Sequence, residues 1–333
     1  MRDECGNRVL LIFTGGTIAM DSETLSSLHT AREILDFVPE IKSLALVDAC
    51  QVCNIDSVEM KPSNWVEIAR LVYERYDDYD GFVVLHGTDT MAYSAAALSF
   101  ILQNLGKPVI FTGSQIPLAS RLATDARNNL INSVRYALMD IAEVCIFFGT
   151  QLLRGNRARK ISGFDINAFK SFSDDPLGTA GVRLSLSRDA RHRSQARPLL
   201  RPRLVTEVFL LKVFPSLSND AIDGLVSIGS RGIVLETYGT GNLPIGPQGL
   251  VPGIRRAIEA GVTIVVATQC EMGSAEDLYP SGKLLKEMGA LMAHDMTPET
   301  ALVKLMWVLG NAAHEREVRD LMLTNITKEF SWP

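Results

Sequence analysis

Apolar runs and helical segments alternate through the first half of the chain. The pattern predicts four short buried strands, at residues 9–13, 82–85, 109–112 and 144–148. Segments with helical periodicity lie between them, at residues 63–76, 90–104 and 124–140. Strands that alternate with helices in this way are typical of βαβ units, which assemble into a parallel sheet.

The same kind of pattern resumes in the second half after a change of composition. Between Arg183 and Arg203 there are seven arginines, two prolines and little periodic apolar sequence, which is typical of a linker. Strands are then predicted at 207–213, 232–237 and 262–268, and helices at 252–260, 281–292 and 298–323. The sequence therefore predicts an α/β protein with mainly parallel sheets in two domains. These are a larger N-terminal domain at 1–185, an arginine-rich linker at 186–204 and a smaller C-terminal domain at 205–333.

Length and composition agree with two globular domains. At 333 residues the chain exceeds what one hydrophobic core usually supports, and its residues are 47% hydrophobic and 21% charged. The net charge of −5 argues against a nucleic-acid partner, and so does the lack of aromatic residues among the arginines. No apolar run reaches the length of a membrane span, and the N-terminal segment lacks a signal-peptide pattern. Five cysteines, an odd number, favour a reducing compartment, so we expect a cytoplasmic protein with no membrane partner.

The cysteines and histidines do not form a recognisable metal site. Cys50 and Cys53 have CxxC spacing, but no second pair accompanies them. The segment after Cys53 heads towards a loop rather than a helix, which argues against a redox pair. None of the five histidines stands at ligand spacing from another. We therefore expect structural thiols, no metal and no cofactor.

Polar clusters stand where the predicted strands of the first domain end. They are Thr14-Gly-Gly-Thr17, His86-Gly-Thr-Asp-Thr90, Gly113-Ser-Gln-Ile-Pro117 and Leu153-Arg-Gly-Asn-Arg-Ala-Arg-Lys160. Each cluster alone is compatible with an ordinary turn, since Gly, Thr, Asp and Asn are turn residues. Ligands bind beyond the carboxyl ends of the strands in open parallel sheets. Together the four clusters therefore predict a site at one rim of the sheet.

Two common chemistries fit these clusters poorly. The run Thr14-Gly-Gly-Thr17 matches neither phosphate-binding glycine pattern, and the residues after it, Thr17-Ile-Ala-Met20, lack a lysine that would neutralise phosphate charge. No serine has glycine at both positions two residues away, as a nucleophile elbow requires. Threonine remains as a nucleophile if a neighbouring base removes its proton. Thr88 and Asp89 would then supply a hydroxyl and a carboxylate, and Lys160 is the candidate base, a role that arginine cannot fill.

Two signatures carry a resemblance to a known family. Thr14-Gly-Gly-Thr-Ile-Ala19 and Val84-Leu-His-Gly-Thr-Asp-Thr-Met91 together resemble the signatures of the bacterial-type L-asparaginases. The runs 79–93, 105–118 and 153–160 are similar to the cytoplasmic type I branch of that family. The resemblance implies two α/β domains and L-asparagine as the substrate. It also implies a homotetramer of intimate dimers, whose active sites lie between N- and C-terminal domains of neighbouring subunits.

The resemblance assigns catalytic roles that the residues alone leave open. In the family the second threonine of the first signature attacks the side-chain amide of the substrate, so Thr17 matches the nucleophile. Thr88, Asp89 and Lys160 match the group that assists proton transfer and activates the attacking group or water. The implied reaction passes through a β-aspartyl ester on Thr17, releases ammonia and ends with hydrolysis to aspartate.

The resemblance also implies a set of substrate-binding residues. Asp56 and Ser57 match the segment that binds the α-amino and α-carboxylate groups of the substrate, and Thr88 and Asp89 share that task. Ser114, in the third polar cluster, is counted with them. From the residues alone, Asp56 and Ser57 are equally compatible with a capped turn before the helix at 63–76.

The chain departs from the family pattern in its loop and its second domain. The loop at 21–30 lacks the tyrosine that closes over the substrate in many relatives, so either another residue such as Thr24 closes the site or catalysis is slower. Glu236 stands where type I enzymes carry an arginine for allosteric asparagine, and Arg159 replaces a small polar residue. We therefore expect allosteric control to be lost or changed. Asn242 is a candidate to reach the site of a partner subunit, with a turn role as the alternative.

The function predicted from these motifs is L-asparagine amidohydrolase. The sequence does not decide whether glutamine is hydrolysed as well, because the one extra methylene of glutamine changes binding in a pocket only weakly. One alternative is the asparaginase-like subunit of a tRNA-dependent amidotransferase. Such subunits usually carry an extra N-terminal domain, whereas eight residues precede the first predicted strand. Another alternative is an impaired, ligand-sensing relative.

Overall fold

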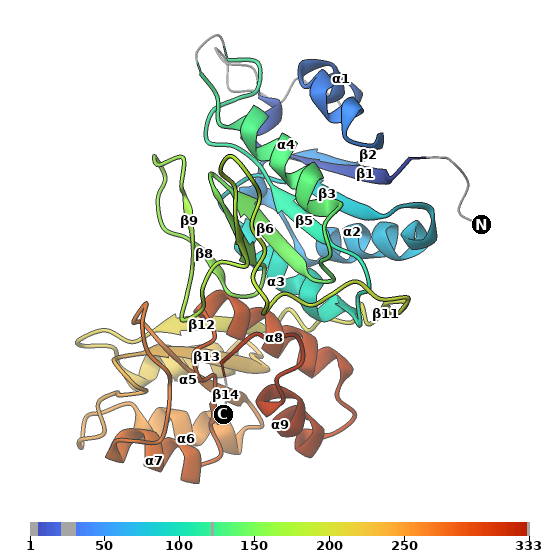
Figure 1. Cartoon of the computed structure of the whole chain (residues 1–333). Coiled ribbons are helices and arrows are strands. Elements are labelled where there is room, and N and C mark those ends of the chain that lie inside the picture. The colour runs from blue at the N-terminus through green and yellow to red at the C-terminus, as the bar shows by residue number, and fades with distance from the viewer. Residues whose placement is uncertain (1–5, 21–30, 121–122, 332–333) are drawn as a thin grey trace. The chain divides into compact units, whose positions relative to one another are not determined.

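The computed structural model describes residues 6–20, 31–120 and 123–331. Their contacts divide the chain into two compact units. The first unit comprises Met1–Ser171 and Asp175–Pro202, and the second comprises Phe172–Asp174 and Arg203–Pro333. Figure 1 shows the elements of both units along the chain. The loop at 21–30, with Thr24, lies outside the described residues.

The arginine-rich segment at 186–204, predicted as a linker, belongs to the first unit except for its last two residues. Arg193 shows the physical reason. Its guanidinium group donates hydrogen bonds to the main-chain carbonyls of Asp80, Ala137 and Met139. A planar group with five N–H donors can satisfy several carbonyls at once. The arginine here ties its segment to the surface of the first unit.

A seven-stranded sheet forms the centre of the first unit, in the order β10-β7-β6-β5-β3-β1-β2. The strands are β1 (Arg8–Gly15), β2 (Leu46–Ile55), β3 (Gly81–Leu85), β5 (Val109–Thr112), β6 (Val144–Phe148), β7 (Gln151–Arg154) and β10 (Gly178–Thr179). All neighbouring pairs from β2 to β6 are parallel, while β7 is antiparallel to both β6 and β10. The edge strand β2, which contains both CxxC cysteines, has no counterpart among the predicted strands.

Helices cover both faces of this sheet. The helices α1 (Ala31–Phe37) and α4 (Ala126–Ala137) contact one face, and α2 (Pro62–Glu74) and α3 (Met91–Ile101) cover the other (Figure 1). On the first face Leu11, Val83 and Ile110 pack with Val134 of α4 in one buried cluster. Because side chains alternate along a strand, their sequence neighbours face α2 and α3. The strands are therefore apolar throughout, as expected for a sheet that is covered on both sides.

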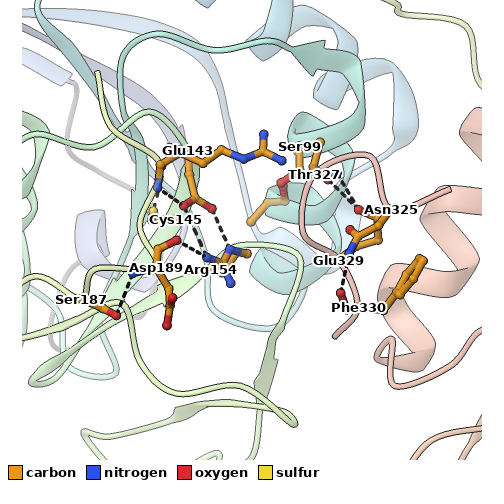
Figure 2. A network of polar contacts seen from close by, with 12 residues as sticks. Ser99, Glu143, Cys145, Arg154, Ser187, Asp189, Asn325, Thr327, Glu329 and Phe330 are labelled. Atoms are coloured by element: carbon orange, nitrogen blue, oxygen red, sulfur yellow. Dashed lines mark hydrogen bonds and ion pairs between the residues drawn. The ribbon is translucent and has the colours of Figure 1, made fainter. Parts of the chain in front are cut away.

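The run 153–160, which sequence analysis placed in one polar cluster beyond the strand at 144–148, is divided between two further strands. Residues Gln151–Arg154 turn back along β6 as β7. Arg154 is held there by a buried ion pair, with its Nε 2.7 Å from Glu143 Oε2, and by the carbonyl of Asp189 (Figure 2). A turn, closed by the N–H of Arg157 and the carbonyl of Arg154 at 3.0 Å, then leads into β8 (Ala158–Lys160), which pairs antiparallel with β9 (Phe169–Ser171). In addition, β4 (Leu102–Gln103) pairs with β11 (Leu199–Leu200).

The second unit contains a four-stranded parallel sheet in the order β12-β13-β14-β15. Its strands are β12 (Val208–Lys212), β13 (Gly232–Thr237), β14 (Thr263–Thr268) and β15 (Leu291–Met292). Its helices are α5 (Asn219–Ser227), α6 (Val251–Glu259), α7 (Pro280–Glu287), α8 (Pro298–Asn311) and α9 (Glu315–Leu323). One buried cluster joins α5, α6 and α7 to one face of the sheet, and α8 packs on β12, β13 and β14. Two α/β units with mainly parallel sheets are thus observed, as predicted.

Two predicted helices of this unit are shorter than expected. The segment 298–323 is two helices, because Ala312 takes an extended conformation and the ring of His314 caps α9 by accepting from the N–H of Glu317. The segment 281–292 leaves the helix after Glu287. Gly289 has a φ of +102°, and the chain continues as the edge strand β15. Periodicity continued across both breaks, so the sequence pattern did not reveal them.

Candidate active site

The first signature leaves β1 through two glycines that contact neighbouring main chain. Gly15 and Gly16 have φ values of +107° and +89°. A Cβ atom added to Gly15 would lie 2.3 Å from the carbonyl oxygen of Ile55. Thr14 is buried and donates from Oγ1 to the carbonyl of Leu85 at 2.8 Å. Thr17 begins the short 3-10 helix Thr17–Ala19 and is half-buried. The two threonines therefore occupy different environments.

The second signature, which follows β3, packs on the segment that contains Ser57. A Cβ atom added to Gly87 would lie 2.6 Å from Ser57 Oγ. Thr90 Oγ1 donates to the carbonyl of Ser57 at 2.7 Å. The loop after β5 also joins this region, because the N–H of Leu118 donates to the carbonyl of Ile18 at 3.2 Å. The exits of β1, β3 and β5 thus meet at one rim of the sheet.

His86 braces this rim from inside, a role that sequence analysis did not foresee. Its ring is fully buried, with Nδ1 2.7 Å from the carbonyl oxygen of Gly87 and Nε2 2.8 Å from Ser94 Oγ. Burial lowers the pKa of His86 to about 4. The neutral ring donates from Nδ1 and accepts the Ser94 hydroxyl at Nε2. In the sequence, the feature that could have indicated this role is the position of His86 directly before Gly87 in the second signature.

Lys160 meets the second signature although it arrives from β8. Its Nζ lies 2.7 Å from Thr88 Oγ1 and 2.7 Å from Asp89 Oδ1. These contacts join residues 72 and 71 positions apart. The Thr88 residue is 5% exposed, and the side chains of Lys160 and Asp89 are 19% and 56% exposed. An amine, a hydroxyl and a carboxylate in contact at the edge of solvent form a possible proton path.

The candidate substrate-binding residues differ in their surroundings. Asp56 is exposed and caps the turn Ser57–Glu59, because its Oδ1 accepts from the N–H of Val58 at 3.1 Å. The side-chain hydroxyls of Ser57 and Ser114 are buried and have no hydrogen-bond partner within the described residues. A buried hydroxyl without a partner is costly, and a polar ligand group would remove that cost.

The residues singled out in the second unit, and Arg159 in the first, have local partners. Asn242 pairs with Tyr238 through the main chain, and its Oδ1 accepts from Ser281 Oγ at 2.6 Å. Glu236 is buried, and Lys212 Nζ lies 3.8 Å from its Oε1. Arg159 lies within the β8–β9 ladder. Each of these contacts lies within the unit to which the residue belongs.

Three further findings concern metal binding, membrane spans and the thiol of Cys53. Over 6–20, 31–120 and 123–331, no group of three or more His, Cys, Asp or Glu side chains is placed to hold a metal ion. The helices in these ranges are all too short or too polar to span a bilayer. Cys53, in β2, donates from Sγ to the carbonyl of Thr14 at 3.4 Å, and burial raises the pKa of its thiol.

Comparison with known proteins covers both units. The family described as "Asparaginase, N-terminal" matches residues 8–192, and the family described as "Glutaminase/Asparaginase C-terminal domain" matches residues 207–322. The chain is 42% identical over 339 residues to a subunit of the glutamyl-tRNA(Gln) amidotransferase of Pyrococcus abyssi, covering 97% of this chain and 76% of that protein. It is 34% identical over 333 residues to L-asparaginase 1 of Escherichia coli, covering 97% of this chain and 98% of that protein.

A solved structure supports the same assignment. L-asparaginase I from Vibrio cholerae matches with a TM-score of 0.90 at 36% identity, covering 98% of this chain and 99% of that one. The predicted fold class, two asparaginase-like α/β domains, is therefore confirmed. The relatives include both amidotransferase subunits and L-asparaginases, so the type I branch stays a prediction. Because the family matches extend over both units and the relatives align along nearly the whole chain, this protein belongs to the asparaginase family.

Proposed function

We propose that the chain is an L-asparagine amidohydrolase of the type I branch, which converts L-asparagine into L-aspartate and ammonia. The observation that carries the proposal is the contact of Lys160 Nζ with Thr88 Oγ1 and Asp89 Oδ1, both at 2.7 Å. A threonine hydroxyl needs a base in contact before it can attack or activate water. The contact places Lys160, which accepts a proton once its amine is neutral, at the rim from which the first signature also emerges.

Thr17 is the proposed nucleophile. Its Oγ bonds to the side-chain amide carbon of asparagine while its proton passes through Thr88 to the neutral amine of Lys160. The C–N bond then breaks, and the leaving nitrogen takes that proton and departs as ammonia. Water next attacks the β-aspartyl ester on Thr17, giving a proton to the same pair. That proton returns to Thr17 as aspartate leaves.

The proposed substrate contacts use the polar groups that surround this path. Asp56 and Asp89 are carboxylates suited to the α-amino group of the substrate, and both are partly exposed. The buried hydroxyls of Ser57 and Ser114 would gain hydrogen-bond partners from the substrate. Thr88 shares in this binding. Because the cap on Asp56 uses one oxygen, its other oxygen is left to accept from an ammonium group.

Ammonia release from L-asparagine and from L-glutamine tests the proposal. Thr17→Ala should lower kcat by at least about 10³-fold, in the range seen when a catalytic nucleophile is removed. Thr17→Ser is the matched control, because it keeps the hydroxyl, and it should retain part of the activity. Undiminished hydrolysis in Thr17→Ala would contradict the role of Thr17, and a wild-type chain that releases no ammonia would contradict the function.

A second candidate function is the asparaginase-like subunit of a tRNA-dependent amidotransferase. The 42% identity to the amidotransferase subunit from Pyrococcus abyssi favours it. In that case ammonia release should require a partner subunit and a charged tRNA, whereas a free amidohydrolase needs neither. Binding of asparagine without any release would instead indicate a ligand-sensing protein.

A homotetramer of intimate dimers, located in the cytoplasm, completes the proposal. Asn242 is the proposed contact with the partner subunit's site. Sedimentation of the wild type should give four times the chain mass, and Asn242→Ala should lower kcat/KM for asparagine without changing the sedimentation coefficient. A fully active monomer would contradict this part of the proposal.

A further inference from the structure

We infer that Gln115 is a positioning residue for the proposed reaction. Its side-chain amide links Thr88 to the loop that directly follows Lys160, and thereby maintains the distance between the two groups that pass the proton. The inference rests on the proposed function, and Gln115 touches neither Thr17 nor the substrate in this scheme. Sequence analysis assigned no role to this residue.

The main chain of Gln115 is firmly anchored. The carboxylate of Asp125 accepts from the N–H groups of Gln115 and Ile116, at 2.9 and 3.0 Å. Asp125 is 9% exposed and is itself held by Asn129 Nδ2 at 3.1 Å, which also donates to the carbonyl of Gly113 at 2.9 Å. Hydrogen bonds to a carboxylate are among the stronger ones. The starting point of the Gln115 side chain is therefore tied to the first turn of α4.

The orientation of the Gln115 amide follows from its partners. Nε2 donates to the carbonyl of Ser162 at 3.3 Å and to the carbonyl of Asp165 at 3.2 Å. Both N–H bonds are thus used, and a flipped amide would place its oxygen against two carbonyl oxygens. Oε1 consequently faces Thr88, whose Oγ1 lies 3.5 Å away. The amide oxygen has a single direction available to it.

The loop that Gln115 binds is a compact unit at the tip of the β8–β9 hairpin. Ser162 Oγ accepts from the N–H groups of Phe164 and Asp165 at 3.1 and 2.9 Å. The N–H of Ile161 donates to the carbonyl of Ala168 at 2.8 Å, which closes the base of the loop. The Gln115 amide, which follows β5 of the large sheet, anchors this loop from outside the hairpin. A shift of the loop would move the end of β8, where Lys160 lies.

The hydroxyl of Thr88 has one proton and two neighbours of different character. While Lys160 is an ammonium group, it donates to Thr88 Oγ1, and the hydroxyl proton points to Gln115 Oε1. When Lys160 is neutral, its nitrogen accepts the hydroxyl proton instead. Gln115 therefore defines the resting direction of the Thr88 proton. Loss of the amide should slow proton transfer, which lowers kcat, while the groups that bind the substrate stay in place.

Steady-state kinetics of asparagine hydrolysis across pH 5 to 10 test the inference with two variants. Gln115→Met keeps the size of the side chain and removes the amide. It should lower kcat by about 10- to 100-fold, the usual cost of a misplaced or poorly paired proton-transfer group, and leave KM within about twofold. Gln115→Glu places a carboxylate beside Thr88 and Lys160. Because a negative charge favours the ammonium form over the amine that must accept the proton, kcat should fall further than in Gln115→Met and its pH profile should change.

The control is Gln248→Met, a change at an exposed glutamine, which should leave kcat and its pH profile unaltered. A purely structural role of Gln115 would lower the melting temperature in both variants without moving the pH profile, and that result would overturn the inference. Wild-type kcat in Gln115→Met would overturn it as well.

Hydrogen exchange of residues 161–168 separates this inference from the proposed function. Gln115→Met should speed exchange in this loop by at least about tenfold, because the loop loses the hydrogen bonds that the Gln115 amide donates to it. Gln248→Met should leave the exchange rates unchanged. An inactive wild-type chain would contradict the amidohydrolase, and faster loop exchange in Gln115→Met would still support the anchoring. Unchanged exchange would overturn the anchoring whether or not the wild type is active.

Discussion

The main chain of Gly16 lies directly against that of Gly87, so that a Cβ atom on Gly16 would stand 2.4 Å from the Cα of Gly87. The contact joins the two signatures, which are far apart along the chain. Thr17 and Thr88 each follow one of these glycines. The close approach of two side-chain-free positions therefore brings the proposed nucleophile and its proton partner to the same rim of the sheet.

Gly16→Ala should damage this junction. The φ of +89° is strained for alanine, at a cost of about 1–3 kcal/mol, and the added methyl group meets rigid backbone. We expect the free energy of unfolding to fall by that amount and kcat/KM to fall by about 10²-fold, as for a displacement of about 1 Å. Chemical denaturation and ammonia release measure the two effects. Gly246→Ala is the control, since no atom lies within 4 Å of its added Cβ; equal behaviour of both variants would contradict the prediction.

Lys160→Arg and Lys160→Met separate charge from proton transfer. Arginine can keep the ion pair with Asp89, but it cannot accept a proton near neutral pH. We therefore expect both variants to lose about 10²- to 10⁴-fold in kcat, the contribution of a general base. A Lys160→Arg enzyme with nearly wild-type kcat would show that Lys160 acts only through its charge.

The stability of the fold should decrease in mild acid because of His86. Its pKa in the folded state, about 4, lies below the unfolded value of 6.5, so the unfolded chain binds more protons between these pH values. The contribution of the neutral His86 ring to the free energy of unfolding is complete above pH 6.5. About 3 kcal/mol of that contribution is lost as the pH falls to 4. Denaturant unfolding at several pH values should show a shallower decrease in His86→Gln than in the wild type. Gln248→Met, a change at an exposed residue without charge, should keep the wild-type slope.

NMR titration checks this prediction on the ring itself. The imidazole signals of His86 should stay unchanged from pH 8 down to about 5, because the ring is neutral over that range. Titration near the ordinary histidine pKa would contradict both the prediction and the bracing role of the neutral ring.

Lys304→Met should destabilise the second unit strongly. Lys304 Nζ donates to Glu329 Oε1 at 2.6 Å, and neither side chain is exposed. Glu329 also accepts from Thr327, as Figure 2 shows. Removing the lysine leaves the buried carboxylate of Glu329 without this ion pair, which costs about 3–5 kcal/mol. Lys286→Met removes an exposed ion pair and should cost less than about 1 kcal/mol. Denaturant unfolding of both variants makes the comparison, and equal losses would contradict it.

The double variant Lys304→Met with Glu329→Gln refines this prediction. A neutral amide no longer needs a cation, so part of the stability lost in Lys304→Met should return. A double variant less stable than Lys304→Met alone would show that the hydrogen bonds of the Glu329 carboxylate to the chain, rather than its pairing with Lys304, dominate.

Much of the fold was readable from local pattern. The apolar runs of β1, β3, β5 and β6 are buried on both faces, so their composition alone identified them. The glycines of the first signature were also readable, because only glycine fits a positive φ with another main chain against it. The edge strand β2 was missed, since its side chains alternate irregularly between half-buried and exposed. A helical pattern continued across residues 312–314, where an extended residue and a histidine cap divide it.

The sequence by itself determined the strand-and-helix order, the parallel sheets and the residue types of the site, because burial and turn geometry leave local periodic traces. The tertiary structure alone decided which groups meet. Lys160 reaches Thr88 only after the chain reverses along β7 and turns into β8, and the contact joins residues 72 positions apart. The burial of Ser57 and Ser114 and the link through Gln115 likewise depend on loops from separate strands. Local periodicity carries no record of such contacts, since they form between segments whose separation along the chain bears no relation to their distance in space.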